Sequence, residues 1–242
     1  MRTQKQWTLV TGGAKGLGAK ICETLAEEGL SLLIHYHTSS QEAFAIRDLC
    51  RQKGRNAECV QGDFSSSESV DLFIEKLSAK FPHIENLINC VGNYRVQAPL
   101  VTSNAEWLEL FQTNLHAPIA LIRALLPSLK EHQGSITHIG VAGINHVPAD
   151  IYSTAFTASK LALWMTTRAL AKEFAPMGVR INMVSPGMLE NTIDKPKDPN
   201  MLPMQRLGTL SEVARVVAFL ISKESSYITG QNIEVAGGVR LI

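Results

Sequence analysis

The most informative stretch of this sequence is Thr11-Gly12-Gly13-Ala14-Lys15-Gly16-Leu17-Gly18. It follows the apolar run Trp7–Val10 and opens the segment Leu17–Glu28, whose apolar residues recur with the period of a helix. Glycines at such a junction allow a tight turn, and they let backbone N–H groups at the helix N-terminus approach a pyrophosphate closely. A glycine cluster alone is weak evidence, because many are ordinary turns. Its position after the first strand and before the first helix nevertheless predicts a dinucleotide-binding turn.

Apolar runs alternate with helical patterns along the rest of the chain. The predicted strands are Trp7–Val10, Ser31–Tyr36, Ala57–Gln61, Asn86–Cys90, Ser135–Ile139, Val179–Val184 and Asn232–Val235. They are continuously apolar, which is typical of a parallel sheet covered by helices on both faces. Capping-box spacing, at Ser65 with Glu68 and at Ser103 with Glu106, precedes two helical segments. The pattern predicts one α/β domain over residues 1–242, a doubly wound Rossmann fold with about seven parallel strands flanked by helices.

The composition limits the classes of function. Of the 242 residues 45% are hydrophobic, and the formal net charge is +1, which argues against both a nucleic-acid-binding surface and disorder. The cysteines Cys22, Cys50, Cys59 and Cys90 lie far apart, so no disulfide framework and no metal site are expected. No apolar window is long enough to span a membrane, and the polar start Met1–Trp7 is unlike a secretory signal. We therefore expect a cytoplasmic protein without a nucleic-acid or membrane partner.

Motifs spread along the chain point to one protein family. The glycine turn has the spacing T-G-x-x-x-G-x-G, and it is followed by Asn89-Cys90-Val91-Gly92, by Asn114 and by Ser185-Pro186-Gly187. With these motifs the chain resembles the short-chain dehydrogenase/reductases. Its C-terminal part, from Arg206-Leu207-Gly208 to Gly237-Gly238, resembles the 3-oxoacyl-[acyl-carrier-protein] reductase branch of that family. The resemblance covers essentially the whole chain and implies a Rossmann fold that binds a nicotinamide dinucleotide.

The segment that ends the second predicted strand bears on the choice of nucleotide. Ile34–Ser40 holds no acidic residue, which would bind the ribose 2′-hydroxyl and repel a 2′-phosphate. Lys15 and the hydroxyls of Thr38, Ser39 and Ser40 offer charge and donors to a phosphate, which favours NADP(H). The alternative is that Lys15 is solvated and that the serines only cap the next helix.

Two further features concern the same end of the nucleotide. The stretch His35-Tyr36-His37 resembles one in the pteridine reductases, which share the fold and use NADPH. Asp63 matches the family aspartate near the adenine ring, although a simple loop-capping role fits equally well. The residues expected to bind the nucleotide are Gly12, Lys15, Gly16, Leu17, Gly18, His37, Thr38, Ser39, Asp63, Asn89, Gly92, Lys160, Pro186 and Gly187.

The resemblance also implies where the chemistry takes place. In the family a tyrosine four residues before a lysine donates a proton to the carbonyl that receives hydride, a serine orients the substrate, and an asparagine holds a proton-relay water. Lys160 and Asn114 match, but the tyrosine position is Phe156, whose ring has no proton to donate. The serine position falls on Gly140 or Val141, and neither side chain forms hydrogen bonds. Loss of a general acid costs roughly 10²–10⁴ in rate, so efficient turnover by the usual mechanism is not expected.

Other ionisable residues nearby are candidates for the missing proton donor. Tyr152 lies one helical turn, about 5.4 Å, before the usual tyrosine level. A local rearrangement of residues 144–151 would bring its hydroxyl toward the nicotinamide; alternatively Tyr152 packs or meets solvent. His138, within a strand, is interpreted as a half-buried histidine. His146 and Asp150 are interpreted as loop-surface residues that are also potential proton sources.

Two longer segments indicate a lid and a partner subunit. Gly187–Pro203 is proline-rich and longer than most loops within compact domains, and we interpret it as a lid over the site. The helical stretch Phe156–Phe174 is apolar nearly all round, and the matching helix of the family packs against a second subunit. A homo-oligomer, either a dimer or a tetramer, is therefore expected; the alternative is a helix deep inside one domain.

Two hypotheses of function follow. The first is NADP(H)-dependent reduction of a carbonyl on a small-molecule or carrier-protein-bound substrate, as in the reductases of fatty acid biosynthesis, with a pteridine as a second substrate class. The second is a nucleotide-binding pseudoenzyme that acts as a structural or regulatory subunit. NADPH binding without turnover would favour the second.

Overall fold

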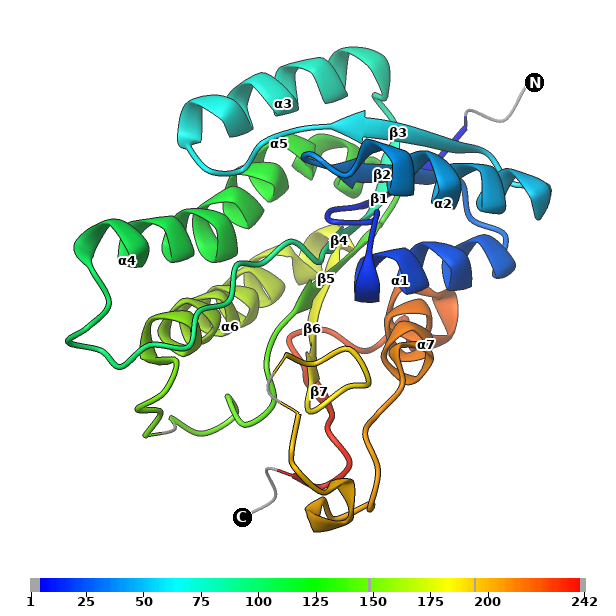
Figure 1. Cartoon of the computed structure of the whole chain (residues 1–242). Helices are drawn as coiled ribbons and strands as arrows, with labels where there is room; N and C mark the ends of the chain where they lie inside the picture. Colours follow the sequence, from blue (N-terminus) through cyan, green and yellow to red (C-terminus); the bar gives the residue numbers. More distant parts are fainter. Residues whose placement is uncertain (1–4, 148, 194, 240–242) are drawn as a thin grey trace.

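The computed structural model describes residues 5–147, 149–193 and 195–239. Its centre is a seven-stranded parallel sheet in the order β3-β2-β1-β4-β5-β6-β7 (Figure 1). The strands are β1 (Trp7–Val10), β2 (Leu32–Tyr36), β3 (Ala57–Gln61), β4 (Ile84–Asn89), β5 (Ser135–Ile139), β6 (Arg180–Pro186) and β7 (Asn232–Val235). Every strand predicted from the sequence is present. The segments 1–7, 144–151 and 187–203, interpreted above, each include residues outside the described ranges.

Helices cover both faces of the sheet, so the predicted Rossmann fold is confirmed. α1, α2 and α7 lie on one face and α3, α4, α5 and α6 on the other (Figure 1). Their bounds are α1 (Gly16–Glu27), α2 (Ser40–Gln52), α3 (Ser67–Lys80), α4 (Asn104–Phe111), α5 (Ala117–Glu131), α6 (Thr154–Phe174) and α7 (Leu210–Ile221). A π-helical turn, Gln112–His116, joins α4 to α5. Within the described ranges no helix is both long enough and apolar enough to cross a membrane.

Strand β1 shows how the two apolar cores form. Successive side chains of a strand point to opposite faces of the sheet. Leu9 and Leu33 therefore pack into the cluster on the α5 side, whereas Val10 and Ile34 pack into the cluster on the α1 side. All four side chains are fully buried, and each such burial stabilises the fold by roughly 1.5–3 kcal/mol. The sheet is thus anchored on both faces, and the carboxyl ends of its strands form a fixed edge.

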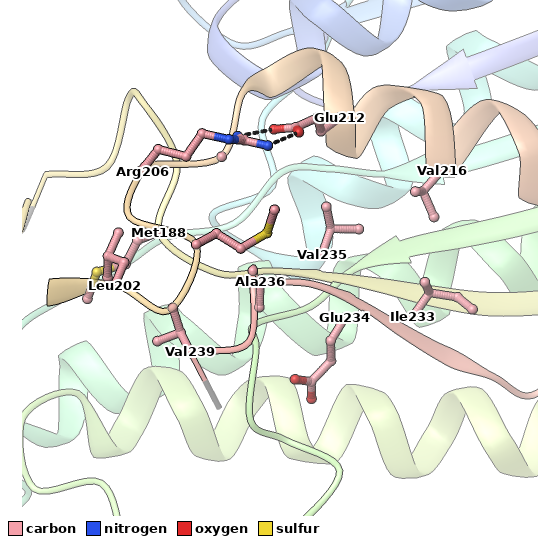
Figure 2. A pocket seen from close by; sticks show the side chains of 13 residues that line it. Met188, Leu202, Arg206, Glu212, Val216, Ile233, Glu234, Val235, Ala236 and Val239 are labelled. Atoms are coloured by element: carbon pink, nitrogen blue, oxygen red, sulfur yellow. Dashed lines mark hydrogen bonds and ion pairs between the residues drawn. The ribbon is translucent and has the colours of Figure 1, made fainter. Parts of the chain in front are cut away.

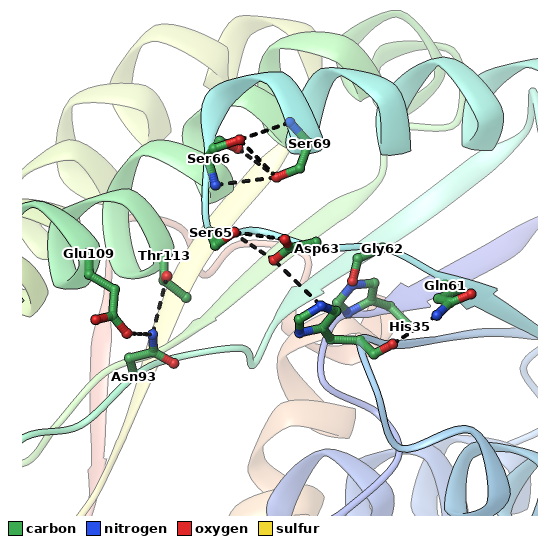
Figure 3. A network of polar contacts seen from close by, with 11 residues as sticks. His35, Gln61, Gly62, Asp63, Ser65, Ser66, Ser69, Asn93, Glu109 and Thr113 are labelled. Carbon is green, nitrogen blue, oxygen red and sulfur yellow. Dashed lines mark hydrogen bonds and ion pairs between the residues drawn. The ribbon is translucent and has the colours of Figure 1, made fainter.

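Of the two predicted capping boxes, one is confirmed and one is wrong. Ser103 caps α4, and the carboxylate of Glu106 accepts a hydrogen bond from the Ser103 N–H at 2.8 Å. At α3 the N-cap is Ser66 rather than Ser65, and its box partner is Ser69 (Figure 3). The hydroxyl of Ser65 is already bonded to the preceding loop, which leaves the next serine to cap the helix.

Candidate active site

The glycine turn between β1 and α1 has an unusual backbone that only glycine tolerates well. Gly12 and Gly16 adopt φ values of +66° and +53°. A Cβ on Gly18 would collide with the carbonyl oxygen of Gly12, so the helix packs closely on the turn. Lys15 occupies the N-cap of α1 without a side-chain capping bond, which leaves the N–H groups of the first turn without a side-chain acceptor there. Donors of this kind hold the pyrophosphate in dinucleotide-binding folds.

Thr11 and His35, which both belong to motifs quoted above, hold this turn in place. The Thr11 hydroxyl accepts hydrogen bonds from the N–H groups of Cys90 (2.9 Å) and Val91 (3.2 Å), just after β4. On the other side, Nδ1 of His35 accepts a bond from the Gly12 N–H at 3.1 Å. Burial lowers the pKa of His35 to about 4, so its ring is neutral at pH 7 and able to accept. The first histidine of the pteridine-reductase-like stretch therefore positions the backbone of the turn.

The expected adenine end lies where β2 and β3 finish (Figure 3). The carboxylate of Asp63 accepts hydrogen bonds from the N–H (2.9 Å) and the hydroxyl (2.7 Å) of Ser65. These bonds, the one from the hydroxyl foremost, lower the pKa of Asp63. The His37 ring nitrogen is 3.8 Å from the same carboxylate. Asp63 has the contacts of a loop cap, which is one of its two predicted roles.

Lys15 has a partner that the sequence analysis missed. Its Nζ lies 2.8 Å from the Glu42 carboxylate, and both side chains are about half exposed. Glu42 is in the first turn of α2, where an acidic residue is favoured by the helix dipole. Ser39 occupies the N-cap of α2 but makes no side-chain capping bond, so its hydroxyl is not used as a cap. Any phosphate that Lys15 binds therefore has to compete with the Glu42 carboxylate for the lysine ammonium group.

Lys160 is the central residue at the expected reaction end. It is only 5% exposed, and its Nζ donates a hydrogen bond to the Ile139 carbonyl, at the end of β5, at 2.9 Å. A Cβ on Gly92 would lie 3.1 Å from this nitrogen, so the loop after β4 closes directly against the amine. Burial lowers the pKa of Lys160 to about 8. The structure therefore brings Lys160 and Gly92 together.

Asn114 is held in the π-helical turn, a feature that is frequent at functional sites. Its Oδ1 accepts from the Asn93 N–H at 2.9 Å, and its Nδ2 donates to the Asn93 carbonyl (3.0 Å) and to the Ser159 hydroxyl (2.9 Å). Asn93 in turn bonds to Glu109 and Thr113 (Figure 3). Asn114 therefore joins the loop after β4 to α6, the helix that carries Lys160. Sequence reasoning missed Asn93 and Ser159 in this link.

The positions at which the resemblance predicts a tyrosine and a serine differ in the space around them. The Phe156 ring lies one turn before Lys160, with 5.9 Å from its centroid to the lysine Nζ. A Cβ on Gly140 would collide with the hydroxyl of Ser185 on β6, so no serine fits there without a shift. Val141 is partly exposed, and its larger side chain is already accommodated. Of the two candidate positions, a serine therefore fits at 141.

A tyrosine that the sequence analysis did not consider packs against Phe156. The rings of Tyr94 and Phe156 meet edge to face, with centroids 4.8 Å apart and planes at 85°. Tyr94 follows Gly92 by two residues in the loop after β4, and 44% of it is exposed. Tyr152, the candidate donor from the sequence, is 71% exposed before α6. No sequence spacing links Tyr94 to α6, so only the fold reveals their contact.

Asp150 caps the start of α6. Its carboxylate accepts hydrogen bonds from the N–H groups of Tyr152 and Ser153, both at 2.9 Å, and from the Thr157 hydroxyl. Partial burial raises the pKa of Asp150, but these bonds, with the Thr157 hydroxyl foremost, outweigh it and lower the pKa to about 2. Asp150 is therefore ionised at neutral pH and is a poor proton source. His146 is exposed on the preceding loop.

His138 was expected to be half-buried, and that expectation is wrong, because it is only 1% exposed. Asn89 on β4 lies opposite it in the strand register, and the Asn89 Nδ2 is 3.2 Å from the His138 Nδ1. Burial, and secondarily the charge of Lys160, lowers the pKa of His138 to about 3. The ring is neutral at pH 7. Asn89, expected to bind nucleotide, is thus tied to β5 beneath the site.

The loop after β6, predicted as a lid, packs against the glycine turn. Gly187 begins it, and its N–H donates to the Val235 carbonyl of β7 at 3.0 Å. A Cβ on Gly16 would lie 3.1 Å from the Asn191 side chain, which shows how closely the loop approaches the turn. The loop includes a 3₁₀ turn, Pro199–Met201, and lies between β6 and α7.

A cavity of about 320 Å³ lies beside this loop (Figure 2). The Arg206 guanidinium and the Glu212 carboxylate, 2.6 Å apart, form one side of it. Its lining residues are Met188, Leu202, Met204, Arg206, Gly208, Glu212, Val216, Ile233, Glu234, Val235, Ala236, Gly237 and Val239. None of the residues expected to bind nucleotide or to take part in chemistry lines it, so it is separate from the site around Lys160.

Comparison with known proteins identifies the family. The family model described as enoyl-(acyl carrier protein) reductase matches residues 12–240. The 3-oxoacyl-[acyl-carrier-protein] reductase FabG of Escherichia coli is 31% identical over 250 residues, which cover 100% of both chains. This chain is a short-chain dehydrogenase/reductase. The putative oxidoreductase YtkK of Bacillus subtilis, 31% identical over 97% of this chain and 96% of its own length, is a further similar protein.

Solved structures resemble this short-chain dehydrogenase/reductase over its full length. Acetoin dehydrogenase from Enterobacter cloacae has a TM-score of 0.89 at 27% identity, covering 100% of this chain and 97% of its own. A blue fluorescent protein from a metagenomic library, solved in complex with NADPH, has a TM-score of 0.89 at 27% identity, covering 99% of both chains. The chain is therefore an NAD(P)-dependent oxidoreductase by family.

Proposed function

We propose that this chain uses NADP(H) to reduce the carbonyl of a 3-oxoacyl group, carried by a small molecule or by a carrier protein. The observation that carries the proposal is the buried Lys160 amine, fixed 2.9 Å from the Ile139 carbonyl and closed over by Gly92. Burying an ammonium group costs free energy unless the group is paired and hydrogen-bonded. A role in binding or catalysis explains why the chain keeps this amine buried beside a single carbonyl. Similarity to FabG over the whole chain supports the substrate class.

The residues present fit a nicotinamide dinucleotide. The uncapped first turn of α1 offers N–H donors to the phosphates, and Lys160 would hold the nicotinamide ribose. Bound NADPH supplies the hydride for the substrate carbonyl carbon. With a pKa of about 8, Lys160 is mostly protonated at pH 7, and its charge stabilises the negative charge that develops on the carbonyl oxygen. The NADPH complex of the similar metagenomic protein supports this choice of cofactor.

The preference for NADP(H) over NAD(H) rests on Lys15. A 2′-phosphate carries more charge than the Glu42 carboxylate, and it offers more acceptor oxygens. We expect Lys15 to leave Glu42, 2.8 Å away, for the phosphate when the nucleotide binds. The hydroxyls of Thr38 and Ser39, at the start of α2, are nearby donors for the same group.

The proton that completes the reduction needs a donor other than Phe156. We assign this step to Tyr94, because its ring packs 4.8 Å from the ring of Phe156 and brings a phenol next to the vacated position. The phenol transfers its proton to the alkoxide as the hydride adds to carbon. Tyr152, more exposed and on the loop before α6, is the second candidate.

Binding and turnover are tested separately. NADPH binding is measured by nucleotide fluorescence, and NADPH oxidation is then followed with an acetoacetyl thioester and, in parallel, with a quinonoid pteridine. Turnover of the thioester that is lost in Lys160→Ala supports the proposal. Turnover of the pteridine alone would change the substrate class, and the absence of both binding and turnover would refute nucleotide-dependent reduction.

The second candidate function is a nucleotide-binding subunit without turnover. It is favoured by Phe156, by the blocked Gly140 position and by the three hydrogen bonds that already engage Asn114 within the chain. NADPH binding without oxidation of either substrate would support it. Such a subunit would act through its assembly with other chains.

We further propose that the chain forms a homo-oligomer, a dimer or a tetramer, in the cytoplasm. Met165 on α6 is 69% exposed, so this helix presents a large apolar side chain to solvent. Light scattering at micromolar concentration tests the assembly, and Met165→Glu should reduce the oligomer if α6 forms the interface.

A further inference from the structure

Three metal-ligating side chains meet at the edge of the sheet opposite the candidate active site. His83 directly precedes β4, Glu131 ends α5, and His132 follows it. One ligand atom from each lies within 4.8 Å of the other two. The Nδ1 of His83 is 3.9 Å from the Glu131 carboxylate, and the two imidazole centroids are 5.6 Å apart. Nothing in the proposed reaction uses these residues.

The two imidazoles each bury a nitrogen without a partner. The Nδ1 of His83 and the Nε2 of His132 are inaccessible to solvent and form no hydrogen bond among the described residues. Most buried polar atoms in proteins are hydrogen-bonded, so such orphans require an explanation. A shared cation explains the two unpartnered nitrogens, because it accepts a lone pair from each. The two nitrogens belong to different parts of the chain and are adjacent to the same carboxylate.

The second nitrogen of His132 is already oriented by a neighbour. Its Nδ1 lies 3.2 Å from the Nε2 of the Gln6 side-chain amide, just before β1. An amide offers either its oxygen or its nitrogen after a simple flip. With the oxygen toward the ring, His132 donates its Nδ1–H to Gln6 and keeps the Nε2 lone pair for a ligand. Metal-binding histidines have this arrangement almost always.

The frame around the cluster is rigid and carries a favourable field. Ser128 of α5 accepts a hydrogen bond from the Ile84 N–H (2.7 Å) and donates to the Ile84 carbonyl (2.9 Å), which ties the helix to the first residue of β4. His132 caps the C-terminus of α5, where the helix dipole places partial negative charge. A cation at this point is therefore favoured by the backbone as well as by Glu131.

We propose that His83, Glu131 and His132 bind Zn²⁺, with water as a fourth ligand. Two imidazoles and one carboxylate are a zinc ligand set, whereas Mg²⁺ and Ca²⁺ prefer oxygen ligands throughout. In a tetrahedral zinc site the ligand atoms are about 3.3 Å apart. The 3.9 Å between His83 and Glu131 has to shorten by about half an ångström, which the 58% exposed Glu131 side chain is free to provide. The other ligand atoms, which lie within 4.8 Å of one another, have to approach by at most about 1.5 Å.

Zinc titration of the tag-free, chelator-treated chain tests the proposal. Calorimetry should show one high-affinity site, and excess Zn²⁺ should raise Tm by about 5 °C when its concentration is about 100-fold above Kd. His83→Gln and His132→Gln should each weaken binding at least about tenfold, because each removes one of three protein ligands. Cobalt(II) in place of zinc should give the visible absorption of a four-coordinate ion, and His132→Gln should abolish it.

His146→Gln is the matched control, because this exposed histidine makes the same substitution outside the cluster. It should bind zinc like the unchanged chain. The double variant His83→Gln/His132→Gln keeps all four cysteines, so residual binding by thiols is measured directly. If a histidine variant fails to fold, Glu131→Gln at the surface replaces it. Equal zinc affinity in the unchanged chain and in the folded variants, or no binding by either, would overturn the proposal.

Discussion

At residue scale, Phe156 stands where the family resemblance predicts a tyrosine, and Gly140 or Val141 stands where it predicts a serine; the space around these positions differs. Phe156 needs one oxygen atom to become a phenol, and it already contacts Tyr94 and faces Lys160. Gly140 has no room for a serine, because Ser185 and Met183 occupy the space a Cβ requires. A substitution that introduces the family hydroxyl is therefore sterically possible at Phe156 and sterically blocked at Gly140.

Restoring the family hydroxyls should raise activity in steps. Phe156→Tyr alone should increase kcat/KM modestly, because no serine orients the substrate. Phe156→Tyr with Val141→Ser should add further, but the gain should stay below the roughly 10²–10⁴ that a general acid contributes, because Tyr94 already supplies a proton. NADPH oxidation with the acetoacetyl thioester gives the values. Gly140→Ser, the control at the crowded position, should lower Tm and leave activity unimproved; an active and stable Gly140→Ser variant would contradict the packing argument.

The two candidate phenols are separable by paired substitutions. Tyr94→Phe should lower kcat by roughly 10²-fold, since the ring is kept and only the acidic proton is lost. Tyr152→Phe should leave kcat unchanged. The opposite pattern would move the donor role to Tyr152. NADPH affinity, measured by fluorescence, serves as the check that neither variant has disturbed the nucleotide.

Lys15 should set the choice between the two nicotinamide cofactors. Lys15→Ala should weaken NADPH binding about tenfold, as expected for the loss of one charged hydrogen bond, and leave NADH binding nearly unchanged. Glu42→Gln, which removes the competing carboxylate 2.8 Å away, should strengthen NADPH binding. Fluorescence titrations with both nucleotides give the ratio. An equal loss of NADPH and NADH affinity in Lys15→Ala would contradict a role on the 2′-phosphate.

At the scale of elements, helix starts place the functional groups. Asp150 caps α6 and so fixes the level of Phe156 and Lys160 along that helix. The π-helical turn between α4 and α5 widens the helix by one residue and points Asn114 across to Ser159. The helical segment predicted after Ser103 gave no sign of this turn, because hydrophobic periodicity does not distinguish a π turn from an α turn over so short a segment.

The corrected cap of α3 gives a direct stability test. Ser66→Ala should destabilise the fold by about 1 kcal/mol, because the side chain accepts a bond from the Ser69 N–H. Ser65→Ala, at the position that the sequence predicted, should cost less, since its hydroxyl bonds only to an exposed loop carboxylate. Urea unfolding of both variants measures the difference. A larger loss for Ser65→Ala would restore the sequence-based assignment.

At the scale of the whole molecule, the parallel sheet decides which distant residues meet. Continuous apolar runs in the sequence were sufficient to predict all seven strands. A strand that is buried on both faces is apolar at every position, so its pattern is a simple run rather than an alternation. The same topology brings Gly92, Asn114 and Lys160 together, and the family motifs located them in the sequence. Contacts between a loop residue and a helix were not predictable: those of Tyr94 with Phe156 and of Lys15 with Glu42 depend on how side chains pack, which no periodicity records.

Two buried histidines should make the stability of the whole fold depend on pH. The pKa values of His35 and His138 are about 4 and about 3 in the folded chain, below the 6.5 of a free histidine. Between these values the unfolded chain binds more protons, so the free energy of unfolding falls as the pH is lowered from 6.5 to 4. Each histidine contributes a slope of about 1.4 kcal/mol per pH unit. In His138→Asn the slope should be smaller by that amount, measured by urea unfolding at pH 4.5, 5.5 and 6.5; an unchanged slope would show that the ring is not neutral.

The hydroxyl of Thr11 couples the motions of two loops, the glycine turn and the loop after β4. It accepts from two successive backbone amides after β4 while its own residue starts the glycine turn, so the two loops have little freedom to move separately. A ligand seated in the turn then also orders the wall beside Lys160, with little additional loss of conformational entropy. Nucleotide loading should preorganise the substrate pocket of this chain, whether or not a hydride is ever transferred.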